Sequence, residues 1–153
     1  MLEIQRTQTE AETVQLSLAG VVDERSDLSP LTAVTSGTLI LDLAGVSRIN
    51  SFGVGRWISA MQELSPDVVV RWDGVSTVMV AQLNMIANFA GPAEIRSFYA
   101  PYFCGACDAE RAVLLERAGL TQPRAPKEQC PECGGALEFD DLEEDYLGGL
   151  LAR

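Results

Sequence analysis

Four cysteines, arranged as two pairs, carry the most specific chemistry in this sequence. Cys104 and Cys107 form one C-x2-C pair, Cys130 and Cys133 form the other, and twenty-two residues separate the pairs. Two intervening residues let both thiolates of a pair reach one ion from a single tight turn. Two such turns complete a tetrahedron with metal–sulfur distances of about 2.3 Å. The spacing predicts a four-cysteine metal site and favours structural Zn²⁺, because four cysteine ligands leave no position open for a substrate.

The second pair lies in CPECGG, which resembles the metal-binding turn of zinc ribbons and rubredoxins. Pro131 stiffens the turn, and Gly134 and Gly135 permit positive φ and leave backbone N–H groups free to bond sulfur. Two other interpretations stay open: a rubredoxin-like iron, and a redox dithiol at either pair. Bound metal would supply much of the folding free energy of so small a module. Residues 108–120 have helical spacing, so a short helix or a plain loop is expected between the pairs.

A second group of candidate residues lies in RINSFGVGRW, residues 48–57, at the junction of an apolar strand and a helix. Asn50 and Ser51 suit a helix start because their side-chain oxygens accept bonds from free backbone N–H groups. Gly53 and Gly55 weaken a helix by roughly 1 kcal/mol each and leave its backbone uncovered for a partner. The positive end of the helix would stabilise a phosphate on Ser51. Ser51 is therefore a candidate phosphorylation site; the alternative is that it only caps the helix.

The longer stretch LILDLAGVSRINSFGVGRW resembles the signature of the STAS domain, a module of sulphate transporters and anti-sigma-factor antagonists. The family pattern is an apolar strand, Asp-Leu, a short turn, and Asp-Ser-x-Gly-Leu-Gly at the start of a helix. The matching residues are Asp42, Leu43, Gly45, Val46, Ser51, Gly53 and Gly55. Asn50 stands where most members carry aspartate, and Phe52 stands where a small hydroxyl residue is common. Val54 replaces the usual leucine.

The resemblance implies a partner-switching role. In such systems the unmodified domain binds an anti-sigma serine kinase, and the phosphorylated domain is released. Ser51 falls at the position that antagonists present to the kinase. The implied partner-binding surface is the loop and helix from Asn50 to Met61, with the contact residues Asn50, Ser51, Phe52, Gly53, Gly55 and Arg56.

The pattern of strands and helices that must position these residues is an alternating one. Two strands are expected within residues 1–24, and a continuous apolar run at 38–46 is typical of a central strand covered on both faces. A short helix is expected with Ser29 as its cap. Further elements are an amphipathic helix to Leu64, a strand at 68–72, a helix at 76–90 and a strand at 93–100.

This order predicts the α/β class: a STAS-like mixed β-sheet with helices, plus a small C-terminal zinc-ribbon module. The expected division is a STAS-like domain over residues 1–100, the four-cysteine zinc-ribbon module over 101–137, and an acidic tail over 138–153. The tail holds six acids between Glu138 and Asp145. It is either solvated, or a segment with Phe139, Tyr146 and Leu147 that docks on a basic partner or on the domain itself.

Composition excludes several classes of function. The net charge of −11 makes nucleic acid an unlikely partner, because phosphate contacts need clustered Lys and Arg. The absence of a long apolar run and of a signal-like N-terminus argues against a membrane span and favours the cytoplasm. There is no histidine in the chain, and no phosphate loop or carboxylate cluster, so no catalytic site is expected. Asp42 is expected to form a hydrogen bond with the backbone at the end of its strand rather than act as a catalytic base.

The function favoured by these observations is a non-enzymatic signalling adaptor that resembles an anti-sigma-factor antagonist. Its expected partner is a serine kinase or another member of a regulatory complex. Two alternatives stay open. One is a scaffold that self-associates as a homo-oligomer without phosphorylation of Ser51. The other is a zinc-ribbon adaptor to the transcription or translation machinery.

Overall fold

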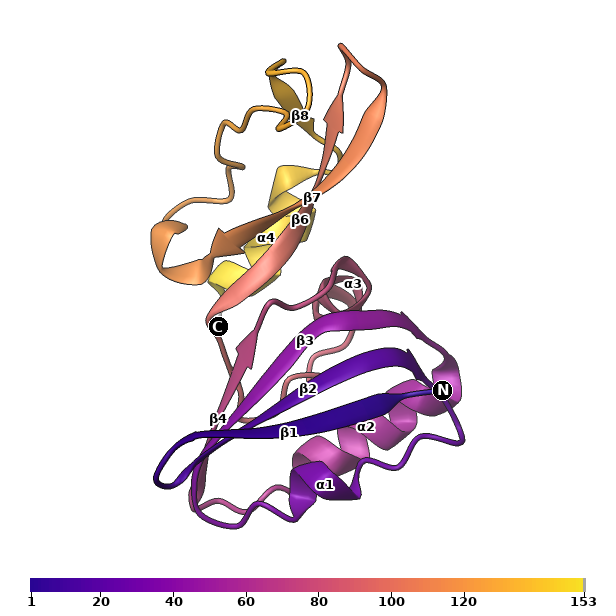
Figure 1. The fold of residues 1–153 in the computed structure, drawn as a ribbon, viewed down its shortest axis with the longest axis vertical. Coiled ribbons are helices and arrows are strands. Elements are labelled where there is room, and N and C mark those ends of the chain that lie inside the picture. Colours follow the sequence, from indigo (N-terminus) through magenta and orange to yellow (C-terminus); the bar gives the residue numbers. More distant parts are fainter. Residues whose placement is uncertain (153) are drawn as a thin grey trace.

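The computed structural model describes residues 1–152, which form two β-sheets joined by one continuous segment (Figure 1). The larger sheet has five strands in the order β1-β2-β3-β4-β5. Their bounds are β1 Glu3–Glu10, β2 Thr13–Val22, β3 Gly37–Ile49, β4 Val68–Asp73 and β5 Glu94–Ile95. β1 pairs with β2 in antiparallel orientation, and the other neighbours are parallel. The expected mixed sheet is confirmed.

Three helices connect the parallel strands. They are α1 (Ser29–Thr32), α2 (Ser51–Glu63) and α3 (Thr77–Met85). α1 and α2 lie side by side along one face of the sheet, and α3 contacts β3 (Figure 1). None of the described helices is long and apolar enough to cross a membrane.

The core of this half follows from strand alternation. In β2, β3 and β4 every second side chain is buried toward α1 and α2, and these include Leu16, Leu18, Leu39, Leu41, Val70 and Trp72. Trp57 of α2 packs edge-on against Trp72, with 5.5 Å between the ring centroids. Its Nε1 also donates to the carbonyl oxygen of Phe89 at 3.1 Å. These contacts fix α2, and therefore its N-terminus, against the sheet.

The expectation that the strand at 38–46 is covered on both faces is wrong. Ile40 and Asp42, which alternate with the buried Leu39 and Leu41 and so lie on the opposite face, are only half-buried, and Ala44 on that face is exposed. Asp42 Oδ1 accepts a hydrogen bond from the backbone N–H of Ala44 at 3.1 Å. The predicted backbone bond of this carboxylate is therefore confirmed.

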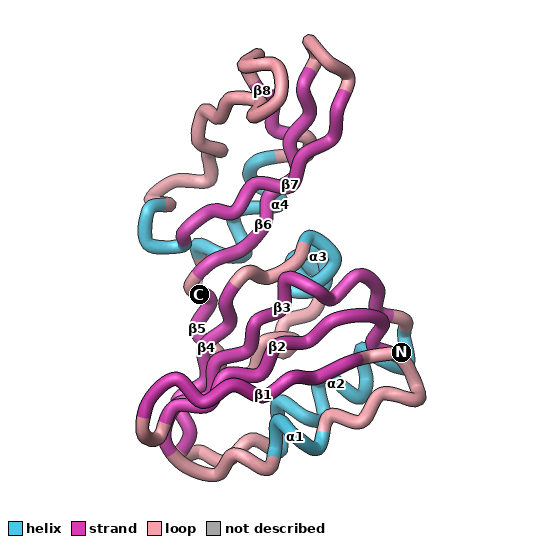
Figure 2. The backbone as a smooth tube through the Cα atoms, in the orientation of Figure 1, coloured by secondary structure: helices cyan, strands magenta, loops and turns pink. Residues whose placement is uncertain are grey.

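The C-terminal half is built on β6 (Ser97–Cys104), which continues almost directly from β5. It pairs in antiparallel orientation with β7 (Ala109–Glu116) on one side and β8 (Leu137–Phe139) on the other. A short 3-10 turn, η1 (Arg117–Gly119), follows β7. The chain ends in α4 (Glu143–Leu151), which packs on α3. Figure 2 shows that this half is mainly strand and loop.

Several expected elements differ from the observed ones. Ser29 lies inside α1 rather than at its cap, which is Leu28. The helix expected at 76–90 ends at Met85, and turns occupy the rest. The single strand expected at 93–100 is divided between the two sheets. Residues 109–116 form a strand rather than a helix or loop, because β6 needs a hydrogen-bonding partner along this edge.

The acidic C-terminal segment is not a solvated tail. Tyr146, Leu147 and Leu150 are buried, and Phe139 is half-buried beside Tyr146 with 5.7 Å between ring centroids. The alternative that this segment docks on the protein itself is therefore confirmed. The acidic residues of its first turn stay exposed.

Candidate metal centre and groove

The four cysteines meet at one point, although their pairs are far apart in the sequence. Their sulfur atoms all lie within 4.8 Å of one another. Two contacts cross between the turns: the sulfur atoms of Cys104 and Cys133 are 3.3 Å apart, and those of Cys107 and Cys130 are 3.7 Å apart. A tetrahedron with metal–sulfur bonds of about 2.3 Å has sulfur–sulfur edges of about 3.8 Å. The cluster therefore has the ligand number and size for one metal ion.

The two turns that carry the cysteines share a backbone design. The residue after the second cysteine of each pair has positive φ: Asp108 at 59° and Gly134 at 72°. In the second turn the N–H of Gly134 donates to the carbonyl oxygen of Cys130 at 2.9 Å. Glycine takes this conformation without strain, whereas Asp108 takes it at some cost. The first turn is thus a less favourable version of the second.

Gly135 is required by close packing beside the sulfur atoms. A Cβ at this position would lie 3.1 Å from the Cβ of Ala106 and 3.2 Å from the Sγ of Cys133. The backbone N–H of Gly135 donates to the same sulfur at 3.4 Å. The N–H···S role expected of this glycine turn is therefore found at Gly135.

The electrostatics of the four thiols also suits a cation. Backbone N–H groups of Cys133 and Glu132 lower the pKa of Cys130 to about 6, and the N–H of Cys107 lowers the pKa of Cys104. The hydrogen bond between the Cys107 thiol and Cys104 raises the pKa of Cys107 to about 12. A cation bound among the four sulfur atoms would offset the repulsion between neighbouring thiolates. Such polarisable thiolate donors prefer soft or borderline metal ions.

Arg111 of β7 is a further residue of this centre, and sequence reasoning missed it. Its Nη2 lies 2.7 Å from the Oε2 of Glu132, inside the second cysteine turn. Hydrogen bonds to Glu132 and Cys130 raise the pKa of Arg111. A tetrathiolate around a divalent ion carries a net charge of −2, which the guanidinium partly offsets. The available signal was that Arg111 shares one face with Ala109 and Val113 at a spacing of two residues, which is visible only when this segment is taken as a strand.

The helix start expected near Asn50 and Ser51 is present at the end of β3. Asn50 is the N-cap, and its Oδ1 accepts from the backbone N–H of Gly53 at 2.8 Å. Ser51 is the first residue of α2, is exposed, and makes no capping bond of its own. The hydroxyl therefore stands at the positive end of the helix with its surface open to another macromolecule.

Asn50 also ties α2 to the segment that follows β2. Its Nδ2 donates to the Oε2 of Glu24 at 3.0 Å, and this bond lowers the pKa of Glu24. An ionised aspartate could not donate here and would repel Glu24. The asparagine is therefore matched to its acidic neighbour, which lies twenty-six residues earlier and was not singled out from the sequence.

The two glycines of α2 have different roles. Gly53 is buried, and a Cβ there would lie 2.1 Å from the carbonyl oxygen of Val22. The expectation that Gly53 leaves backbone open to a partner is therefore wrong, because β2 already occupies that space. Gly55 has no neighbour within 4 Å of such an atom, so its surface is open as expected.

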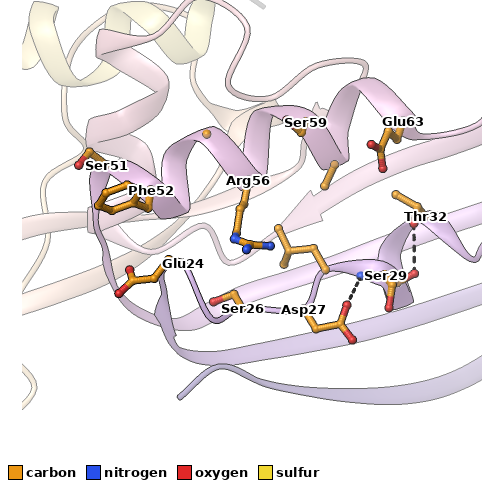
Figure 3. A pocket seen from close by; sticks show the side chains of 13 residues that line it. Glu24, Ser26, Asp27, Ser29, Thr32, Ser51, Phe52, Arg56, Ser59 and Glu63 are labelled. Atoms are coloured by element: carbon orange, nitrogen blue, oxygen red, sulfur yellow. Dashed lines mark hydrogen bonds between the residues drawn. The ribbon is translucent and has the colours of Figure 1, made fainter.

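A groove of about 730 Å³ runs between α2 and the segment that contains α1 (Figure 3). Ser51 and Phe52 lie at one end of the groove, and Glu63 lies at the other. Phe52 is 69% exposed, which is unusual for so large an apolar side chain. Arg56 extends from α2 toward Asp27, and no acid of the described chain lies within ion-pairing distance of it (Figure 3). The groove thus has an open apolar end and acidic walls.

Fold and site together define a mixed α/β protein with a four-cysteine cluster that could hold a metal ion. In comparisons with known proteins, no family model matches the chain, and no match was found among curated proteins.

Proposed function

We propose that the protein is a non-enzymatic signalling adaptor of the STAS type that binds a partner through the groove between α1 and α2. The single observation that carries this proposal is the exposed pair Ser51 and Phe52 at the N-terminus of α2, beside an open groove. The strand order and the junction motif both support the STAS assignment. The proposed regulation is phosphorylation of Ser51 by a partner serine kinase.

The groove favours a partner of definite chemistry. Glu24, Asp27 and Glu63 line it together with Arg56. A partner that inserts an apolar side chain beside Phe52 and presents basic side chains to the acids would complement this surface. A phosphate on Ser51 would add about −1.5 to −2 charge at the same end of the groove as Glu24. It would repel the acidic groups already there and change the surface that the partner meets.

The metal of the proposed adaptor is Zn²⁺, with a structural role. The donor set is entirely thiolate, so no ligand position is open for catalysis. Cys104, Cys107, Cys130 and Cys133 would hold the ion, while Arg111 would offset its excess negative charge. Reduced cysteines at a zinc site fit a cytoplasmic protein, which is the proposed location.

The test is a pull-down from the native host, combined with intact-mass analysis of the protein isolated there. We expect wild type and Ser51→Ala to retain one serine kinase, and Ser51→Glu and Phe52→Ala to lose it. Val69→Ala is the matched control, because Val69 is a 51% exposed apolar residue of β4 outside the groove. The proposal fails if Ser51 is never modified and all four variants retain the same proteins.

A further inference from the structure

α4 is held to the rest of the protein by contacts at both of its ends. The side chain of Asn84 in α3 donates to the carbonyl oxygen of Tyr146 at 3.1 Å, and the Tyr146 hydroxyl donates to the carbonyl oxygen of Tyr99 in β6. At the other end Arg117 donates to the carbonyl oxygens of Leu150 and Leu151 at 2.9 and 3.3 Å. These carbonyls have no partner within the helix, so Arg117 caps its C-terminus.

The chain that enters α4 comes directly from the cysteine cluster. β8 begins four residues after Cys133, and its Leu137 pairs with Cys104 in β6. The N–H of Asp140 then donates to the carbonyl oxygen of Pro101 at 2.9 Å. β8 has only three residues, so the cysteine turn beside it must hold its register.

Side-chain packing makes the same connection between the cluster and α4. Tyr102 of β6, Phe139 of β8 and Tyr146 of α4 form a row of edge-on aromatic contacts, with centroid distances of 5.5 and 5.7 Å. The row starts two residues from the ligand Cys104 and ends in the buried face of α4. A loss of order in β8 would remove the middle ring of the row.

We infer that metal bound by the four cysteines holds α4 in its docked position on α3, so that metal loading governs whether this face of α3 is covered. Without metal no ion joins the two cysteine turns, so β8 loses its anchored turn, and α4 loses both its entry strand and Phe139. The larger sheet has its own core around Trp57 and Trp72, so it keeps its fold when α4 leaves. The inference requires a metal at the cysteines, and it does not require phosphorylation of Ser51 or the partner proposed above.

Thermodynamic linkage makes the inference testable from both directions. If metal favours docking of α4, then undocking of α4 must weaken metal binding by the same factor.

Two adjacent glycines of α4 offer a matched pair of variants. A Cβ at Gly149 would lie 2.3 Å from the Oδ1 of Asn84, whereas a Cβ at Gly148 would meet nothing within 4 Å. Gly149→Ala therefore displaces the Asn84 amide that bonds Tyr146, while Gly148→Ala only favours the helix.

The experiment uses the full chain, with Zn²⁺ affinity measured by chelator competition and the tetrathiolate followed by the Co²⁺ absorption spectrum. We expect Gly149→Ala to weaken Zn²⁺ binding by about tenfold, a typical coupling between sites, and Gly148→Ala to match or exceed wild type. Tyr146→Phe, which removes only the hydroxyl that bonds Tyr99, is expected to weaken binding by a smaller factor.

Amide hydrogen exchange supplies a readout that does not depend on affinity. Removal of the metal is expected to raise exchange in residues 143–151 by about tenfold or more, with β2 and β3 unchanged. The inference is overturned if α4 stays protected in the metal-free protein, or if β2 and β3 lose protection together with it. It is also overturned if Gly149→Ala exposes α4 to exchange yet binds Zn²⁺ as wild type does.

Discussion

Substitution of Gly53 by alanine tests how closely α2 approaches the larger sheet. A Cβ at Gly53 would lie 2.1 Å from the carbonyl oxygen of Val22 and 3.0 Å from the backbone nitrogen of Asp23. Ordinary contact begins at 3.4 Å, so the first turn of α2 must retreat by about 1.3 Å from the end of β2. These neighbours are backbone atoms at the end of a strand, so they have little freedom to move away.

The expected loss of stability follows from two opposing terms. Overpacking of this kind costs about 1–3 kcal/mol, and the better helix propensity of alanine returns up to about 1 kcal/mol. A contact of 2.1 Å with a backbone oxygen belongs in the upper part of that range, about 2–3 kcal/mol, so Gly53→Ala should lower the free energy of unfolding by about 1–2 kcal/mol. Gly55→Ala is the matched control, because a Cβ there meets nothing within 4 Å. It should raise the free energy of unfolding by up to about 1 kcal/mol.

Urea denaturation of the metal-saturated protein, followed by circular dichroism, measures both variants. The midpoint should fall for Gly53→Ala and rise for Gly55→Ala, with the slope of the transition unchanged in both. Equal stability of Gly53→Ala and wild type would refute the close approach of α2 to β2.

Two further predictions concern single residues of the metal turns and the helix cap. Asp108→Gly removes a side chain from a residue with φ of 59° and should stabilise the metal-bound protein by about 1 kcal/mol in thermal unfolding. Asn50→Asp replaces the donor to Glu24 by a carboxylate, so the pKa of Glu24 should rise from its lowered value, as NMR titration would show. In wild type the contribution of the Glu24–Asn50 bond is fully present above the ordinary glutamate pKa of 4.5 and is lost as pH falls through the lowered pKa of the folded protein. An unchanged Glu24 titration in Asn50→Asp would contradict the hydrogen bond.

The larger sheet and its helices could be predicted from the sequence because apolar residues recur in them with a clear strand or helix period. Leu16 and Leu18 alternate with polar residues, and Trp57 and Met61 recur at helical spacing, so each element has one buried face. The cysteine spacing was equally informative, since two C-x2-C turns can meet around one ion whatever joins them. The cluster at 3.3–3.7 Å agrees with that expectation.

The C-terminal half was harder to predict because tertiary contacts override its local pattern. DAERAVLLERAGL has apolar residues at helical spacing, yet residues 109–116 pair with β6 along their whole length. The helix α4 was not predicted because its segment is dominated by acidic residues. The segment has only three buried apolar residues at helical spacing, which are Tyr146, Leu147 and Leu150. Arg111 and Glu24 contact their sites from positions distant in the sequence, and no local pattern says which site each of them joins.

The two halves are joined by more than a linker, and this affects how a signal at one end could reach the other. Next to the start of β6, Arg96 pairs with Asp73 through two hydrogen bonds; Ser97 Oγ accepts from the N–H of Gly74 at 2.8 Å. At the other end of the same strand Cys104 belongs to the four-cysteine cluster. β6 is therefore fixed to the larger sheet at one end and to the four-cysteine cluster at the other. The cysteines are thus connected to α3 through β6 and through α4, whereas Ser51 lies at the start of α2, which packs on the sheet through Trp57. Metal loading and modification of Ser51 should therefore act as separate inputs, and Zn²⁺ affinity should be the same in Ser51→Glu and wild type.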